Sequence, residues 1–509
     1  MLSKIFSAGL IGIDAYPVEV EVDITGGGLP TWNTVGLPEN SVREGRDRVI
    51  AAIKNSGYEF MHRKITINLA PADIKKEGTA FDLPIALGLL ASSNGLNKDL
   101  LPKYLVVGEL TLSGMIKPIR GALAVALIAK KNRFQGIILP KENGTEAAIV
   151  KDLEILAVSH LSEVVEFLNG KRQLFSFPPE ISPLNSNGHY DSDFSEIRGQ
   201  EQAKRAIEVA AAGGHNILMI GPPGTGKTML AQRIPTILPP LSFEEALETT
   251  KVYSALGLVE KQKPLLTDRP FRAPHHTISD AGLIGGGTVP KPGEVSLAHR
   301  GVLFLDELPE FKKNVLEVLR QPIEGGKVTI ARAFSTLTFP ADFMLVAAMN
   351  PCRCGFLTSP HQSCSCTSLQ KQNYRTRLSG PLLDRIDIHI EVPPVRYTEL
   401  AALGEGESSS SIRERVLAAR EKQAIRLHKQ KIYANSQMGP RLVRRFCTLT
   451  TEGNRLLETA MTKLNLSARA YDRILKVART IADLVASDAI QTKHLAEAIQ
   501  YRSFDRNRG

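Results

Sequence analysis

The sequence predicts an α/β protein with an all-helical C-terminal region. Short β-like runs alternate with helical runs over residues 1–170 and again over residues 196–403, an alternation typical of α/β domains. From Ile412 to Arg502 the hydrophobic residues follow a helical period, and no strand-like run occurs. The chain has 509 residues, enough for about three domains at roughly 100–200 residues each.

The first predicted domain spans residues 1–170. Its strand-like runs are Val18–Ile24, Ile65–Ala70 and Tyr104–Leu110, and its helical runs are Ser41–Ser56, Pro84–Ser92 and Ala122–Lys131. Residues 171–195 hold prolines, asparagines and a glycine without an apolar period, which indicates a linker. Residues 196–403 form the second α/β domain. The helical domain covers residues 404–509 and begins with the flexible connector Gly404–Ser411.

Composition and charge restrict the class of protein. Hydrophobic residues make up 43% of the chain, and no apolar run reaches about 18 residues, so no membrane span is expected. The N-terminus lacks a signal-peptide cleavage pattern, which predicts a cytoplasmic protein. The net charge of +10 suits a polyanionic partner, although solvated basic faces give the same total. The charge is uneven, because residues 411–446 hold ten Lys/Arg against two Glu.

A glycine-rich loop between a strand and a helix predicts a phosphate-binding site. The apolar run Asn216–Ile220 leads directly into Gly221, Pro222, Pro223, Gly224, Thr225, Gly226, Lys227 and Thr228. This is the P-loop pattern in its required strand–loop–helix context. The glycines let backbone N–H groups approach phosphates, and the helix N-terminus adds a favourable dipole. We expect Lys227 to reach the β and γ phosphates of ATP, and the Thr228 hydroxyl to bind Mg²⁺.

Two further strand ends carry the polar residues that hydrolysis needs. The apolar run Val302–Leu305 ends in Asp306 and Glu307. We expect Asp306 to hold Mg²⁺ through its water shell, and Glu307 to polarise the attacking water. The strand Phe343–Met349 ends at Asn350, which we interpret as a sensor beside the γ-phosphate. A turn-forming asparagine before a proline is the alternative interpretation.

Four motifs together carry a family resemblance: GPPGTGKT, VLFLDE, AAMNP and the LLDRID of Leu382–Asp387. They resemble the AAA+ family, and the magnesium-chelatase-like branch known as YifB or ComM proteins is similar over essentially the whole chain. The resemblance implies an AAA+ P-loop α/β core with a parallel sheet, a Lon-protease-like N-terminal domain and a C-terminal helical lid. It also implies a closed ring, a homo-hexamer.

The resemblance also assigns catalytic arginines. In the family, the arginine of LLDR crosses a subunit boundary to the neighbour's γ-phosphate, and this arginine is Arg385 here. Such a cation neutralises charge on the transferring phosphoryl group and makes hydrolysis depend on assembly. The segment Leu466–Arg473 resembles the sensor-two helix of the lid, so Arg469 is the expected second cation, acting in cis or in trans. Arg473 is the second choice, and a solvated helix face is the alternative.

Two excursions between these motifs are expected to face the ring pore. The first, Gly282–Gly293, is glycine-rich and carries Lys291, and in the resembled branch it is an insert that points into the ring. The second pairs two β-like halves around Arg332, which by the resemblance touches DNA phosphate; an exposed arginine on a turn is the alternative. Adjacent His275 and His276 are a weak metal candidate, because neighbouring side chains diverge on a helix.

Four of the five cysteines form a cluster: Cys352, Cys354, Cys364 and Cys366. Such a cluster in a cytosolic protein indicates a metal rather than disulfides. Four thiolates favour tetrahedral Zn²⁺, so we predict a zinc loop at residues 352–366. An iron–sulfur cluster and free thiols are the alternatives, and His361 is a substitute ligand. Cys447 stands alone and is expected to be a buried small hydrophobe.

The N-terminal domain lacks the residues of a peptidase. Residues 76–84 and 108–121 resemble Lon-type peptidases, in which a lysine activates a serine nucleophile. Ala80 occupies the serine position, and no lysine follows Gly121 until Lys130. Without a nucleophile and a base we expect no peptidase activity. We interpret this domain as an assembly or DNA-contacting module.

These features favour a hexameric ATP-dependent motor on single-stranded and branched DNA. The resembled ComM proteins are branch-migration helicases that help to integrate incoming single strands during natural transformation. The alternative is a magnesium-chelatase-type ATPase subunit that remodels a protein partner. The basic excess, Arg332 and the cysteine loop favour DNA. An inactive scaffold is disfavoured by the complete set of Lys227, Asp306, Glu307, Asn350 and Arg385.

Overall fold

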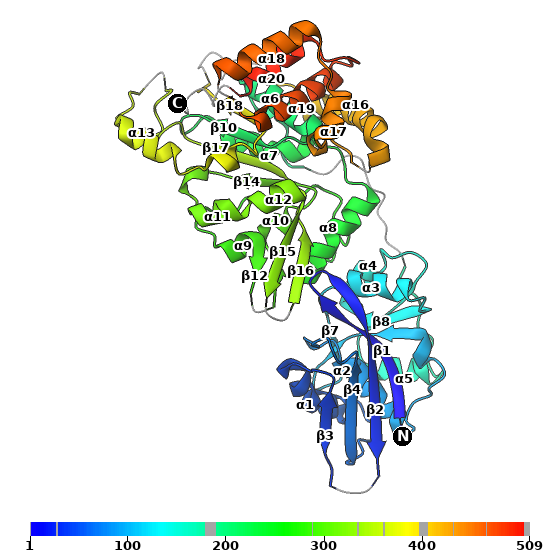
Figure 1. The fold of residues 1–509 in the computed structure, drawn as a ribbon. Coiled ribbons are helices and arrows are strands. Elements are labelled where there is room, and N and C mark those ends of the chain that lie inside the picture. The colour runs from blue at the N-terminus through cyan, green and yellow to red at the C-terminus, as the bar shows by residue number, and fades with distance from the viewer. Residues whose placement is uncertain are drawn as a thin grey trace. The chain divides into compact units, whose positions relative to one another are not determined.

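The computed structural model describes most of the chain. The described residues are 2–26, 29–178, 190–287, 289–332, 335–359, 362–395, 406–430, 432–464 and 466–502. The chain divides into two compact units, Met1–Asn185 with Phe243–Leu266 and Ser186–Ser242 with Thr267–Gly509. In Figure 1 the first unit is mainly blue to cyan, and the second is mainly green to red. Among the described residues, no helix combines the length and the apolarity that a membrane span requires.

A seven-stranded mixed sheet forms the centre of the first unit. Its strands lie in the order β3 (Trp32–Val35), β4 (Lys64–Ala70), β2 (Asp14–Thr25), β1 (Leu2–Ile11), β5 (Tyr104–Val106), β8 (Gly136–Pro140) and β9 (Glu154–Val158). Val18, Val20 and Val22 are fully buried, because alternate residues of a strand share one face. The helices include α1 (Asn40–Asn55), α2 (Asp82–Ser92), α3 (Ala122–Lys131), α4 (Gly144–Ala147) and α5 (Leu161–Leu168).

Helix α8 (Phe243–Leu256) belongs to the first unit although it follows the P-loop in the sequence. Leu247 packs against the apolar cluster that includes residues of α3. The Gly121 N–H donates to the Ser254 carbonyl at 2.9 Å, and the Ser254 hydroxyl donates to Glu146. The sequence places this helix inside the second predicted domain, because its apolar pattern does not show which sheet it covers.

A five-stranded parallel sheet forms the centre of the second unit. Its order is β11 (Phe271–Arg272), β14 (Val302–Leu305), β17 (Met344–Met349), β10 (Ile217–Ile220) and β18 (Ile388–Glu391). Every residue of β10, β14 and β17 is buried, as in strands covered on both faces. Parallel strands share one carboxyl edge, so the residues after these three strands meet there. The predicted parallel α/β core is confirmed.

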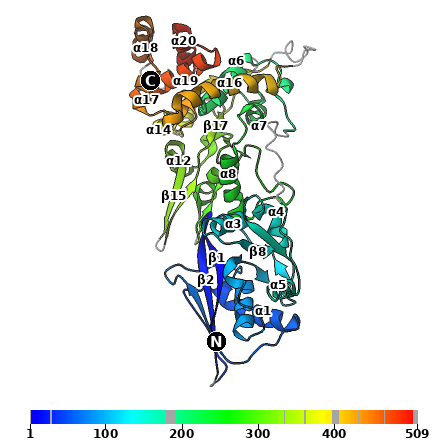
Figure 2. The same cartoon turned by 90° about the vertical axis from the view of Figure 1, so that its right-hand side faces the viewer.

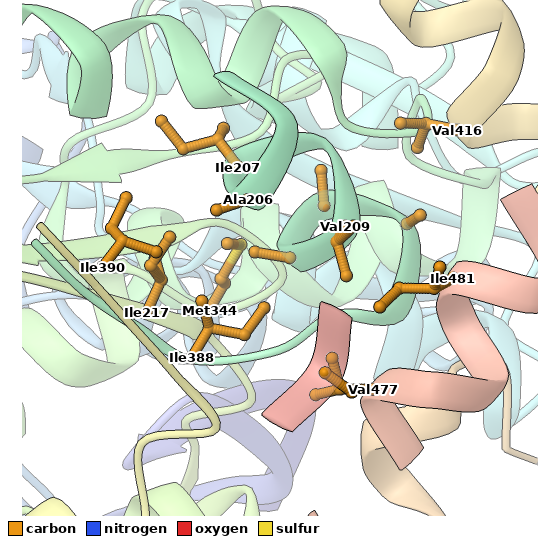
Figure 3. Packing of buried hydrophobic residues seen from close by; sticks show 14 of the residues in the cluster. Ala206, Ile207, Val209, Ile217, Met344, Ile388, Ile390, Val416, Val477 and Ile481 are labelled. Carbon is orange, nitrogen blue, oxygen red and sulfur yellow. The ribbon is translucent and has the colours of Figure 1, made fainter. Parts of the chain in front are cut away.

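In the described part of the C-terminal region the α-helices are α16 (Ser409–Leu427), α17 (Pro440–Phe446), α18 (Thr451–Lys463), α19 (Ala468–Leu484) and α20 (Thr492–Gln500). Figure 2 shows them gathered at one end of the second unit. One apolar cluster joins them to the sheet; Figure 3 shows Ile207 of α6 (Glu201–Gly213) and Ile217 with Val416, Val477 and Ile481. The predicted helical C-terminal region is confirmed, and it shares its core with the sheet.

Candidate active site

The P-loop lies between β10 and α7 (Lys227–Ile237), at the carboxyl edge of the sheet. The Gly221 N–H donates to the Met349 carbonyl at 3.2 Å, which ties the loop to the neighbouring strand. Gly224 and Gly226 have φ angles of 75° and 79°, in the left-handed region that glycine adopts without strain. The loop conformation therefore depends on glycine at these two positions, as the motif predicts.

Lys227 is buried at the centre of the site, with 8% of its surface exposed. Its Nζ donates to the carbonyls of Gly221 at 2.8 Å and Pro222 at 2.9 Å, and it lies 3.4 Å from Oδ1 of Asn350. Burial lowers the pKa of Lys227, while Asp306 and Glu307 favour its charged form. Phosphate oxygens are better acceptors for this cation than neutral carbonyls, so the site can exchange these bonds for contacts to a nucleotide.

Thr228 and Asp306 lie together beside Lys227. The Thr228 hydroxyl donates to Oδ2 of Asp306 at 2.8 Å, and Oδ1 of Asp306 accepts the Glu307 N–H at 2.9 Å. A hydroxyl and a carboxylate at this distance provide oxygen ligands of the kind that Mg²⁺ takes beside phosphates. The two residues fit the shared magnesium role that the sequence predicts.

Glu307, the second residue after β14, adopts the left-handed conformation with φ of 51°. Oε2 of Glu307 lies 3.5 Å from Nδ1 of His276, and this contact was not predicted from the sequence. The interpretation of His275 and His276 as diverging residues of a helix is wrong, because they follow β11 in a non-helical segment. Their ring centroids are 4.1 Å apart. Among the described residues, the four cysteines are the group of three or more His, Cys, Asp or Glu side chains placed closely enough to hold a metal ion together.

Arg385 is held inside its own subunit. Its side chain is 6% exposed, and its guanidinium contacts Oε1 of Glu324 at 2.7 Å and the Pro381 carbonyl at 2.6 Å. Arg469 is exposed near the start of α19. Arg473, which is half-buried, forms an ion pair with buried Asp387 and donates to the Arg385 carbonyl at 3.0 Å. Arg473 thus supports the LLDRID segment, which weakens its interpretation as a second phosphate contact.

The four clustered cysteines converge. Their sulfurs lie within 4.8 Å of one another, with Cys352 at 3.4 Å from Cys354 and 3.7 Å from Cys364. Tetrahedral zinc with bonds of about 2.3 Å places sulfurs about 3.8 Å apart, so the cluster fits this ion. Backbone N–H groups, first that of Phe356, lower the pKa of Cys354 to about 5, whereas burial raises the pKa of Cys352 to about 12.

The cysteine loop also touches the P-loop. A Cβ atom added to Gly355 would lie 2.7 Å from Cδ of Pro223, so this contact requires glycine. His361, the substitute ligand, lies outside the described residues. Cys447 is buried, as expected for an isolated small hydrophobe.

The two predicted excursions lie next to one another. Strands β12 (Gly285–Gly286) and β13 (Lys291–Pro292) pair antiparallel, as do β15 (Lys327–Arg332) and β16 (Ser335–Pro340) (Figure 1). A Cβ atom on Gly286 would lie 3.7 Å from Nη2 of Arg332. Lys291 and Arg332 are both exposed. The excursions therefore present two cations from neighbouring hairpins.

The basic stretch of residues 411–446 is less available than its composition suggests. Arg415 pairs with Glu208 and Glu407, and Arg426 pairs with Asp483. Arg413 and Arg420 donate to backbone carbonyls of neighbouring helices. Much of this positive charge is therefore used in ion pairs and hydrogen bonds between the helical region and the core. Arg441, Arg444 and Arg445 of α17 are exposed.

Ala80 and Lys130, the first lysine after Gly121, lie on different elements of the N-terminal unit. Ala80 lies in the turn before α2, whereas Lys130 lies at the end of α3 and pairs with Asp152 at 3.1 Å. Lys76, near Ala80, is fully buried and donates to the Ile74 carbonyl at 2.7 Å. Burial lowers the pKa of Lys76. No nucleophile stands at the Ala80 position for such an amine to activate.

Comparison with known proteins shows the family. Residues 193–400 match the family described as "Magnesium chelatase, subunit ChlI", residues 20–143 match "Subunit ChlI of Mg-chelatase", and residues 406–502 match "Magnesium chelatase, subunit ChlI C-terminal". The chain is 47% identical over 506 residues to "Uncharacterized protein YifB" of Escherichia coli, covering 99% of this chain and 98% of that protein.

Two other relatives differ in how much they share. "Competence protein ComM" of Haemophilus influenzae is 46% identical over 511 residues, which cover 99% of this chain and 98% of that protein. "Magnesium-chelatase subunit ChlI" of Synechocystis is 25% identical over 233 residues, covering 41% of this chain and 58% of that protein. The chain belongs to the ComM/YifB family of magnesium-chelatase-like AAA+ ATPases.

Proposed function

We propose that this protein is a hexameric ATP-dependent DNA motor that promotes branch migration and strand integration during natural transformation in the cytoplasm. The observation that carries the proposal is the pair of exposed cations, Lys291 and Arg332, on hairpins of the same unit that holds the P-loop. Cations on adjacent hairpins suit contacts to the phosphate backbone of DNA. Such contacts do not depend on the base sequence. The name of the Haemophilus relative, a competence protein, supports the same process.

Each site residue has one role in hydrolysis. Lys227 and the P-loop N–H groups bind the phosphates, and Thr228 and Asp306 would hold Mg²⁺, which would supply positive charge beside the phosphates. Glu307 accepts a proton from the attacking water, and Asn350, 3.4 Å from Nζ of Lys227, orients that water. Arg385 of an adjoining copy of the chain adds a positive charge beside the γ-phosphate.

Arg332→Ala should weaken DNA binding through lost phosphate contacts. Each duplex phosphate contact contributes about −0.9 to the slope of log affinity against log salt, so the slope should fall by about one contact per engaged subunit. The cost should be similar on unrelated sequences. DNA-free ATPase should persist, whereas stimulation by a four-way junction should decrease. Fluorescence anisotropy across a salt series and ATPase assays measure these changes.

Lys327→Ala is the matched control, because it removes an exposed cation from the other end of β15. It should leave junction stimulation nearly unchanged. If the junction fails to stimulate the wild type and binding is lost at modest salt, the magnesium-chelatase-type role on a protein partner becomes the better proposal.

Arg385→Ala should retain ATP binding and lose turnover. A phosphate-directed arginine supplied by another subunit contributes about 10³–10⁵-fold in kcat, so a loss on that scale is expected in steady-state assays. Mixing Arg385→Ala with Lys227→Ala subunits should restore part of the activity, because each supplies the half of the interface that the other lacks. Wild-type turnover by Arg385→Ala would remove the trans-acting assignment.

We also propose that the cysteine loop binds one Zn²⁺ through Cys352, Cys354, Cys364 and Cys366. The convergence of four sulfurs within 4.8 Å supports this, and four thiolates match the donor set of structural zinc sites. The closed set of four protein ligands fits a structural ion without an open position for a substrate. The zinc would then hold the loop that contacts Pro223.

A further inference from the structure

Arg385 is joined to the base of the hairpin that carries Arg332. Its partner Glu324 lies on α12 (Arg320–Gly325), and Gly326 alone separates that helix from β15. The Gly326 carbonyl accepts the N–H of Ala341, the residue after β16, at 2.9 Å. Glu324 therefore lies two residues before the point where both strands of the hairpin leave the core.

The backbone of Arg385 is fixed by contacts independent of Glu324. Its carbonyl accepts from Nδ2 of Asn216 at 3.2 Å and from the guanidinium of Arg473 at 3.0 Å. Asn216 also accepts the Leu345 N–H at 2.8 Å, which anchors this point between the central strands. The part of Arg385 that can change its position is thus its side chain, which is held by Glu324 and by the Pro381 carbonyl.

In this position the Arg385 side chain does not form all the hydrogen bonds it could form. The side chain is 6% exposed, and Nε has no hydrogen-bond partner among the described residues. A buried donor without an acceptor is unfavourable, and Glu324, with half of its side chain exposed, is a partner of modest strength. A phosphate group supplies more charge and more acceptor oxygens, so it can compete for the guanidinium once Glu324 moves away.

We propose that Glu324 is a positioning residue that holds Arg385 away from the adjoining subunit until the Arg332 hairpin engages DNA. This inference rests on the proposed function, because it requires Arg385 to act in trans and the hairpin to contact DNA. Beyond that function, the ion pair of Glu324 and Arg385 is the contact through which DNA binding raises ATP turnover. Contact at the hairpin tip moves its base, the Glu324 carboxylate withdraws, and Arg385 becomes available.

Glu324→Gln should raise DNA-free turnover by about two- to fivefold, the factor that an ion pair of this exposure is worth. The KM for ATP should stay constant, because Glu324 does not touch the nucleotide loop. The junction-stimulated rate should match that of the wild type, so the ratio of stimulated to DNA-free rate should fall. Glu324→Asp, which keeps the charge on a shorter side chain, should give an intermediate DNA-free rate.

Glu317→Gln is the matched control, because Glu317 of α11 (Lys313–Val318) pairs with Arg320 of α12 at 2.6 Å, on the helices that precede the hairpin. It should leave both rates unchanged. Unchanged or lower DNA-free turnover in Glu324→Gln would overturn the proposal. So would a faster rate in Glu324→Gln/Arg385→Ala than in Arg385→Ala alone, since Glu324 would then act on another group. A wild-type rate in Arg385→Ala alone would instead remove the trans-acting assignment.

Discussion

Lys227→Ala should lose ATP binding, whereas Glu307→Gln should bind ATP and fail to hydrolyse it. Lys227 can give at least two charge-assisted hydrogen bonds to phosphate, each about 1.5–3 kcal/mol, which together correspond to a loss of about a hundredfold or more in affinity. Glu307→Gln keeps the shape of the side chain but removes the proton acceptor, so kcat should fall about 10²–10⁴-fold. Nucleotide binding by fluorescence and steady-state ATPase assays separate the two effects.

Gln202→Ala is a useful control for both variants, because Gln202 is an exposed residue of α6. It should leave affinity and turnover intact. Equal turnover in Glu307→Gln and the wild type would show that another group accepts the proton. ATP binding by Lys227→Ala at the wild-type level would remove the phosphate role of the P-loop lysine.

Replacing Cys352 and Cys354 by serine should remove the metal and destabilise the second unit. The purified wild type should carry about one zinc per chain, and the double variant should carry nearly none. Structural zinc contributes binding free energy to folding, about 10–16 kcal/mol in zinc-finger peptides, so the melting temperature should fall clearly. Because Gly355 packs on Pro223, ATP affinity should fall as well.

Metal analysis by mass spectrometry and a thermal melt measure these outcomes. Cys447→Ala removes the one cysteine outside the cluster and should retain full metal content. Freshly purified, unchelated wild type without zinc would contradict the proposal. Iron with visible absorption would favour the iron–sulfur alternative.

Local sequence patterns predicted the buried strands and the polar residues that follow their carboxyl ends. Buried strands β10, β14 and β17 are short apolar runs, and each is followed by the residues that the chemistry requires. The predicted strand Tyr104–Leu110 divides into β5 and β6 (Glu109–Leu110) at Gly108. A Cβ there would lie 2.9 Å from Ile116 of β7 (Ile116–Lys117), the strand that pairs with β6, so the interruption coincides with a local hairpin.

Contacts between distant residues were outside what the sequence could show. The approach of His276 to Glu307, the pair of Glu324 and Arg385, and the internal bonds of Arg415 all join residues far apart in the chain. A charge count treats every arginine as exposed, whereas the fold decides which ones meet an acceptor. The net charge therefore says less about which cations are exposed than the position of Arg332 on its hairpin does.

The allocation of α8 to the first unit changes what a truncation of this protein would mean. The chain passes from one unit to the other after Asn185, after Ser242 and after Leu266, so three peptide links join them instead of one. Deleting the residues before Ser186 would strip the apolar partners from Phe243, Leu247 and Leu265. The N-terminal unit is thus interwoven with the ATPase along the chain, and neither part is separable by a single cut.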